Sequence, residues 1–152
     1  MRQIKGSSIL VTGGAGFIGQ NIIKQLVQLN PEEIFCLDNF STGNRQVLSE
    51  YTDVTQIIGD VHDTLWMGKS NKTGGGFDKL DFIFHFAAPC SVVQFNRSPE
   101  KCVKETIQGF QNVIALAKRT DAKVIYPSSG NVYGNASPQS EEVIPKPTNY
   151  YG

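Results

Sequence analysis

Short apolar runs alternate with amphipathic stretches along most of this chain. Five runs have the length and apolar character of β-strands, and they span residues 8–12, 33–38, 55–60, 81–88 and 122–129. The fourth run, "DFIFHFAA", is almost uniformly apolar, which is typical of a central strand covered on both faces. The pattern therefore predicts five strands with one of them deep in a sheet.

Two stretches between these runs have the period of an amphipathic helix. The first begins at Phe17 and is ended by Asn30-Pro31, and the second begins at Pro99, which is preorganised for a first helical turn. The apolar positions of the first helix are Phe17, Ile18, Ile22, Leu26 and Leu29. Those of the second, which we expect to form one apolar stripe, are Val103, Ile107, Phe110, Ile114 and Ala117.

Strands that alternate with helices pair in parallel through right-handed crossovers. The fold class expected is therefore α/β, a doubly wound parallel sheet formed by residues 1–152 as one domain. Two segments break the alternation: residues 68–79 are rich in Gly, Lys and Asn, and residues 134–149 contain several prolines. We expect both to be irregular loops.

Composition changes this picture mainly by exclusion. Lys plus Arg and Asp plus Glu number 14 each, so no net charge attracts nucleic acid. No apolar stretch approaches the roughly 20 residues of a membrane span, and no signal sequence precedes the first strand, so we expect no membrane partner and a cytoplasmic location. Three dispersed cysteines and two isolated histidines predict neither a disulfide framework nor a metal site.

A glycine-rich turn joins the first strand to the first helix. In "TGGAGFIG", Gly13, Gly16 and Gly19 recur every three residues, and Gly14 also fits the G-x-G-x-x-G spacing. Glycine permits a tight turn in which backbone N–H groups approach a pyrophosphate, and the helix N-terminus adds a partial positive charge. The context of strand, turn and helix predicts a dinucleotide site here.

Asp38 ends the second predicted strand, 19 residues after Gly19. A carboxylate at that place accepts hydrogen bonds from the adenosine ribose hydroxyls. The same negative charge would repel a 2′-phosphate, so the predicted cofactor is NAD and not NADP.

Five sequence blocks then resemble one family in the same order. They are "TGGAGFIG" (12–19), "LDNFSTGN" (37–44), "GDV" (59–61), "HFAAP" (85–89) and "PSSGNVYG" (127–134). They resemble the extended short-chain dehydrogenase/reductase family, in its NAD-dependent nucleotide-sugar epimerase and dehydratase branch, which has a Rossmann fold. The resemblance implies that Asp38 and Asn39 hold the adenosine ribose and that Asp60 and Val61 border the adenine.

The residues that the motifs and the resemblance together assign to the cofactor lie at the carboxyl ends of predicted strands and on the second helix. They are Gly13, Gly16, Phe17, Ile18, Gly19, Asp38, Asn39, Ser41, Thr42, Gly43, Asp60, Val61, Phe86, Ala87, Ala88, Pro89 and Thr106. At position 106 the family usually has Asn, and the shorter Thr leaves this contact open.

The resemblance also implies two catalytic residues. Ser129 would hydrogen-bond the reacting sugar oxygen, and Tyr151 would act as the base, because Tyr151-Gly152 matches the start of a Tyr-x-x-x-Lys arrangement. Tyr150 is the weaker candidate for the base because its neighbour is Tyr. The lysine would fall beyond Gly152, so we expect the chain to be part of a longer protein, without the strands that follow the fifth, and to be inactive alone.

Three functions remain open at this point. The resemblance favours a UDP-glucose 4-epimerase type, which moves hydride from a sugar carbon to NAD and back through a keto intermediate. A UDP-glucuronate decarboxylase or sugar-nucleotide dehydratase is the alternative, since "HFAAPCS" is similar to that branch. A non-catalytic NAD-binding module is the third. The expected partners are a UDP-sugar and, in the full-length protein, a second copy of the chain.

Overall fold

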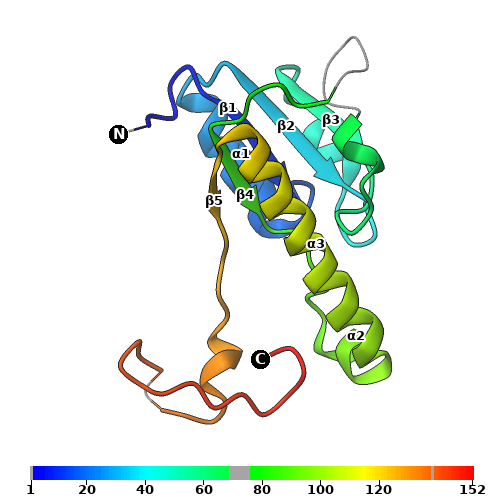
Figure 1. Ribbon diagram of the computed structural model, residues 1–152, viewed down its shortest axis with the longest axis vertical. Coiled ribbons are helices and arrows are strands. Elements are labelled where there is room, and N and C mark those ends of the chain that lie inside the picture. Colours follow the sequence, from blue (N-terminus) through cyan, green and yellow to red (C-terminus); the bar gives the residue numbers. More distant parts are fainter. Residues whose placement is uncertain (1, 69–75, 138) are drawn as a thin grey trace.

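The computed structural model describes residues 2–68, 76–137 and 139–152 and contains one parallel sheet (Figure 1). The strands are β1 (Ser8–Thr12), β2 (Glu33–Asp38), β3 (Val54–Ile58), β4 (Phe82–His85) and β5 (Lys123–Ile125). Their order is β3-β2-β1-β4-β5, and each neighbouring pair is parallel. The predicted doubly wound α/β fold is thus confirmed.

β1 is the middle strand of the sheet, and β4, which contains the long fourth run, is also an interior strand because it lies between β1 and β5. β4 is shorter than the predicted strand, because it ends at His85. Residues 86–88 continue beyond the end of the strand, at the carboxyl edge of the sheet. β5 is likewise only three residues long and lies at an edge of the sheet.

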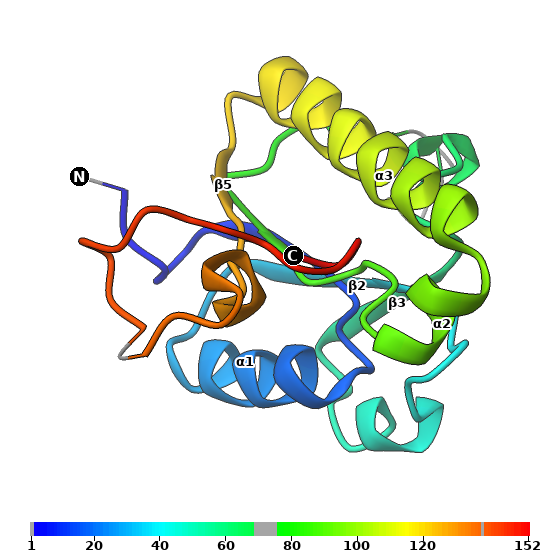
Figure 2. The same ribbon diagram turned by 90° about the horizontal axis from the view of Figure 1, so that it is seen from below.

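Helices cover both faces of the sheet (Figure 2). α1 (Phe17–Gln28) lies on one face and α3 (Pro99–Thr120) on the other, with the short α2 (Val92–Arg97) preceding α3. Three 3₁₀ turns, η1 (Arg45–Leu48), η2 (Leu65–Gly68) and η3 (Gly130–Tyr133), complete the described elements. The predicted starts at Phe17 and Pro99 are confirmed, whereas α2 was missed.

The core is divided by the sheet into two clusters. Strand residues alternate between them, so that Ile9 and Val11 join α1 while Leu10 joins α3. Around the α3 side, Trp66 and Phe77 meet edge to face at 6.2 Å between ring centroids. Burial of these apolar side chains is the main force that holds the helices on the sheet.

The predicted apolar stripe of α3 is wrong in its orientation. Val103 and Ile107 are 36% and 53% exposed, and the buried face instead carries Gly109 and Asn112 together with apolar neighbours. Gly109 packs so closely against Val61 that an added Cβ would lie 2.7 Å from Cγ1 of Val61. Close backbone approach and a polar contact thus set the helix orientation, and apolar periodicity registers neither.

The structure also bears on the cysteines, metal ligands, membrane spans and loops considered in the sequence. Cys36, Cys90 and Cys102 are free thiols, and no cluster of metal-ligating side chains occurs within the described ranges. Among the described helices, none combines the length and apolarity needed to cross a membrane. Of the predicted loop 68–79, residues 69–75 lie outside the described part of the chain. The predicted irregular segment 134–149 contains no helix or strand in its described residues.

Candidate functional site

The glycine-rich turn is the tightest point at the carboxyl edge of the sheet. Gly13 has φ of +69°, a left-handed conformation that glycine adopts without strain. A Cβ on Gly13 would lie 2.7 Å from the backbone nitrogen of Ala87, and one on Gly19 would lie 2.2 Å from the carbonyl oxygen of Gly13. The turn is therefore compressed between the end of β4 and the first turn of α1, and both positions require glycine.

The N-terminus of α1 is left open by this turn. Gly16 is its N-cap and provides no side-chain cap, and no acidic residue occupies the first helical turn. The first N–H groups of a helix have no intrahelical partner, and they carry the positive end of the helix dipole. Phe17 and Ile18 beside them are 82% and 55% exposed. This is the arrangement that binds a phosphate group.

Asp38 turns its carboxylate toward the glycine-rich turn. Its Oδ2 accepts a hydrogen bond from the backbone N–H of Ala15 at 2.9 Å, and its Oδ1 accepts one from Phe40 at 2.8 Å. The residue is only 8% exposed. Each oxygen keeps a further lone pair, so the carboxylate is fixed in orientation and can still accept hydrogen bonds from a ligand.

The loop after β2 folds back over the same turn. The backbone N–H of Asn44 donates to the carbonyl of Ala15 at 3.2 Å, and a Cβ on Gly43 would lie 2.8 Å from Cβ of Ala15. Ser41 and Thr42 remain exposed at the outside of this loop. Of the predicted residues on this loop, the structure thus brings Gly43 against the glycine-rich turn.

A side-chain network links the loops after β2 and β3. Asn39 donates through Nδ2 to Oδ2 of Asp60 at 2.7 Å, and its own Oδ1 accepts from the backbone of Ser41 at 2.9 Å. The other oxygen of Asp60 lies 2.7 Å from Nδ1 of His62. Asn39 and Asp60 therefore hold each other in place at the position predicted for the adenosine.

The end of β4 is pinned to β1 through a buried hydroxyl. Oγ1 of Thr12 lies 2.7 Å from Nδ1 of His85 and accepts from the backbone N–H of Ala87 at 3.2 Å. Burial lowers the pKa of His85 to about 4, so the ring is neutral near pH 7 and its hydrogen bond with the threonine hydroxyl joins two uncharged groups. The ring stacks on Tyr126 at 5.5 Å between centroids. His85 therefore has a structural role, because it links β4 to β1 and packs on Tyr126.

This pinning fixes the predicted stretch 86–89 beside the turn. Phe86 donates its backbone N–H to the carbonyl of Thr12 at 3.0 Å, which continues the sheet pattern past β4. Phe86, Ala87 and Pro89 are half-buried, and Ala88 is exposed. Phe86 and Ala87 pack directly against the turn at Gly13, so this stretch and the turn lie together at the carboxyl edge of the sheet, where open α/β sheets have their ligand crevice.

Asn112 of α3, which the sequence analysis did not single out, contacts the loop after β3. Its Nδ2 donates toward the carbonyl oxygens of Val61, His62 and Asp63 at 3.0, 2.9 and 3.0 Å. The available signal was a polar residue within an apolar helical segment, "NVIALA". Thr106, in contrast, donates its hydroxyl to the carbonyl of Cys102 at 2.8 Å, one turn back on its own helix.

The two predicted catalytic residues lie in the segment that follows β5. Oγ of Ser129 accepts from the backbone N–H of Asn131 at 3.2 Å and caps η3. The chain then returns, because Nδ2 of Asn149 reaches Oδ1 of Asn131 at 3.5 Å. Tyr151 meets Phe95 of α2 edge to face at 5.4 Å. Within the described residues, no hydrogen bond joins Ser129 and Tyr151 directly.

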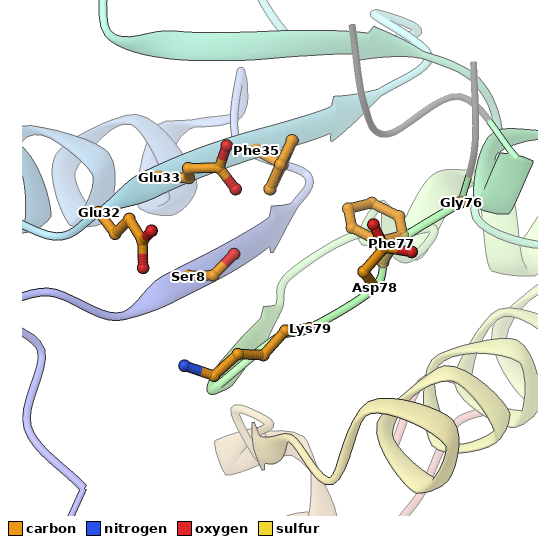
Figure 3. Close-up of a pocket in the computed structure, with 8 residues that line it drawn as sticks. All are labelled: Ser8, Glu32, Glu33, Phe35, Gly76, Phe77, Asp78 and Lys79. Atoms are coloured by element: carbon orange, nitrogen blue, oxygen red, sulfur yellow. The ribbon is translucent and has the colours of Figure 1, made fainter. Parts of the chain in front are cut away.

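A cavity of about 210 Å³ lies elsewhere in the molecule (Figure 3). Ser8 and Glu33, the first residues of β1 and β2, line it together with Phe35 and Phe77. It therefore opens at the amino ends of the strands, opposite to the edge that carries the glycine-rich turn. Ligands of open α/β sheets bind at the carboxyl edge, so the crevice beside Gly13 remains the candidate site.

Comparison with known proteins gives this geometry its context. Residues 9–152 match the model of the NAD dependent epimerase/dehydratase family. The chain belongs to this family. The UDP-glucuronic acid decarboxylase 6 of Arabidopsis thaliana is 35% identical over 135 residues, which cover 88% of this chain and 37% of that protein. The epimerase/dehydratase assignment confirms the resemblance seen in the sequence blocks.

Solved structures of the same fold agree with it. A UDP-galactose 4-epimerase has a TM-score of 0.79 and 32% identity, and the alignment covers 95% of this chain and 46% of that one. A dTDP-glucose 4,6-dehydratase from Streptomyces venezuelae, crystallised with NAD, has a TM-score of 0.80 and 27% identity, with 95% and 47% covered. This chain thus spans less than half the length of these relatives.

The cofactor of the epimerase/dehydratase family is NAD, as the family description states. The residues of this chain fit such a ligand on structural grounds. Gly13 and Gly19 permit the tight turn between β1 and α1, the start of α1 is uncapped, and the buried carboxylate of Asp38 faces the turn. Dinucleotide sites of this fold class require these three features together.

Proposed function

We propose that this chain forms the NAD-binding part of an enzyme that oxidises the sugar of a UDP-sugar. The observation that carries the proposal is the hydrogen bond from Ala15 to Asp38, because it places a fixed carboxylate directly beside the glycine-rich turn. The turn would hold the pyrophosphate through backbone N–H groups, and Asp38 would accept bonds from the ribose hydroxyls. When bound, NAD supplies the hydride acceptor.

The chain's own residues would divide the remaining work between the two sides of the crevice. Asn39, Asp60 and Val61 would enclose the adenosine, and Phe86 to Pro89 would line the opposite wall. Ser129 would hydrogen-bond the reacting sugar oxygen, and Tyr151 would take the hydroxyl proton. The contact of Tyr151 with Phe95 supports this role, because it fixes the phenol ring against α2, the helix that follows the Phe86 to Pro89 wall.

The first candidate for the reaction is decarboxylation of UDP-glucuronic acid. The curated relative at 35% identity carries that name, so the sequence itself favours this member of the family. The second candidate is 4-epimerisation, which the likeness to the UDP-galactose 4-epimerase structure supports. Assembly as a homodimer and a cytoplasmic location, both expected from the sequence, stay proposals.

Calorimetric titration of the chain with NAD and NADP tests the cofactor part. We expect NAD to bind at least about tenfold more tightly than NADP, because a carboxylate repels the 2′-phosphate. Binding of neither would disprove the assigned site. A preference for NADP would refute the role given to Asp38.

The reaction is tested with the protein expressed from the complete gene, NAD and one UDP-sugar at a time. Release of carbon dioxide from UDP-glucuronic acid would support the decarboxylase, and interconversion of UDP-galactose and UDP-glucose would support the epimerase. If NAD binds and neither product forms, both reaction assignments are wrong while the cofactor assignment stands. A Tyr151→Phe variant should bind NAD normally and lose turnover.

A further inference from the structure

We propose that Asn112 is a positioning residue for the adenosine side of the crevice. It acts through the backbone of residues 61–63, and the inference rests on the proposed function. Asn112 is 6% exposed and lies on α3, on the helix face turned to the sheet. Neither the cofactor motifs nor the expected catalytic residues include it.

The geometry shows a buried polar side chain whose donor group is directed at one loop. An amide nitrogen carries two hydrogens, and Nδ2 of Asn112 faces the carbonyl oxygens of Val61, His62 and Asp63 within 3.0 Å. Its Oδ1 accepts from Nε2 of Gln108 at 3.1 Å, which fixes the orientation of the amide group. Three successive carbonyls are thereby held on one atom of α3.

The same loop is constrained at two further points. Val61 is 7% exposed and fits against Gly109, where an added Cβ would lie 2.7 Å from Cγ1 of Val61. Asp60 is held by Nδ2 of Asn39 at 2.7 Å from the neighbouring loop. The position of the Asp60–Val61 peptide therefore depends on α3 on one side and on the loop after β2, which contains Asn39, on the other.

Loss of the Asn112 amide would affect this loop selectively. Its three carbonyls would lose their buried donor, and an unsatisfied buried acceptor drives the backbone to move or to admit water. The glycine-rich turn is held by other contacts, namely those of Gly13 with Leu37 and of Ala15 with Asp38. Asn112 should therefore control affinity for the adenosine half of the ligand and leave the nicotinamide half unaffected.

The test compares ADP with nicotinamide mononucleotide as ligands of the chain, well below its unfolding temperature. We expect Asn112→Ala to weaken ADP binding roughly tenfold and to leave binding of the mononucleotide unchanged. Gln108→Ala is the matched control, because it removes only the partner of Oδ1 from the same helix. Leu26→Ala is the stability control, since Leu26 belongs to the core on the opposite face of the sheet.

Each outcome decides the question. If Asn112→Ala binds ADP normally, or if both ligands weaken in proportion as they do in Leu26→Ala, Asn112 is only structural and the inference is wrong. If Asn112→Ala does not fold, the same binding test is made with Asn112→Ser, which keeps one hydrogen-bond donor. In the unmodified chain, the side-chain amide protons of Asn112 should shift in NMR spectra with ADP and not with the mononucleotide. Unmodified protein that binds no nucleotide would instead refute the proposed function.

Discussion

The glycine-rich turn and the segment after β5 carry the two halves of the candidate site, and they are built in different ways. The turn is locked by backbone contacts with β2, β4 and α1, and an atom added at Gly13 or Gly19 would collide with main chain. In the segment after β5, most residues from Tyr126 to Gly152 are exposed or half-buried, and its contacts are mainly local side-chain hydrogen bonds. The cofactor half of the site is thus part of the core, and the catalytic half is attached to it.

This difference explains why the two halves respond to different forces. Burial and steric exclusion define the turn, so a change there should cost both folding and nucleotide binding. The later segment has few buried apolar contacts, and such segments open locally at low free-energy cost. Four changes, taken from the largest expected effect to the smallest, test this contrast.

Gly19→Ala should have the largest effect. The new methyl would lie 2.2 Å from the carbonyl oxygen of Gly13, and overpacking against backbone costs about 3 kcal/mol or more. Urea denaturation should show this loss, and NAD binding should disappear even where the protein remains folded. Gly68→Ala is the control, since its added Cβ would meet nothing within 4 Å in the described part of the chain. Equal stability of the two variants would contradict the steric account of the turn.

Acid should weaken the turn region through His85. The folded pKa is about 4 and the unfolded value 6.5, so between these values the unfolded chain binds more protons. The free energy of unfolding is therefore unaffected by His85 above pH 6.5. It should fall by up to about 3 kcal/mol in total as the pH drops toward 4. Unfolding curves at several pH values measure this slope. His85→Gln cannot titrate and should flatten it, and an unchanged slope would exclude His85 as the cause.

Asp38→Asn keeps the size of the side chain and removes its charge. One amide hydrogen would then face a backbone N–H of Ala15 or Phe40 where an oxygen now accepts, at a cost of about 1 to 2 kcal/mol. NAD affinity should fall roughly tenfold, and the preference over NADP should shrink because the repulsion is gone. Parallel titrations with both cofactors measure the ratio. A ratio equal to that of the unmodified chain would show that Asp38 does not select the cofactor.

Asn131→Ala should have the smallest effect on stability, about 0.5 kcal/mol or less, because the side-chain partners of Asn131, Ser129 and Asn149, lie in the same exposed segment. Its effect should appear in hydrogen exchange. The amide of Gly152, which donates to Oδ1 of Asn149, should exchange faster because Asn149 loses its bond to Asn131. Asn135→Ala, an exposed change in the same segment, serves as control. A large fall in unfolding free energy would show that the segment belongs to the core after all.

The same contrast separates what could be read from the sequence from what could not. Gly13 follows β1 directly, Gly19 lies in the first turn of the helix that comes next, and Asp38 ends β2. Because the parallel topology fixes where strand ends lie, local sequence was sufficient to place these three residues at one edge of the sheet. The strands themselves were found by their apolar runs, although β4 and β5 proved shorter than those runs. Their ends depend on which residues find a partner strand, and composition does not record this.

The sequence analysis missed one very short helix and the contacts that join distant segments of the chain. α2 has six residues, too few for a helical period, and is marked mainly by Ser91, which accepts from the backbone of Gln94 at 3.4 Å. The buried face of α3 was misplaced because Gly109 and Asn112 are buried by contact with a loop about 50 positions earlier in the chain. The contact of Tyr151 with Phe95 also joins distant segments, and no local pattern predicts it.

The strand order reverses between β1 and β4, and this affects how freely the residues around the candidate site can vary among these proteins. The connections leaving these two adjacent strands pass to opposite faces of the sheet, so the gap between them arises from chain path and needs no particular side chain to keep it open. Lining residues can then be exchanged while the hollow persists. A decarboxylase, an epimerase and a dehydratase can accordingly share one fold and differ in the residues around the ligand site.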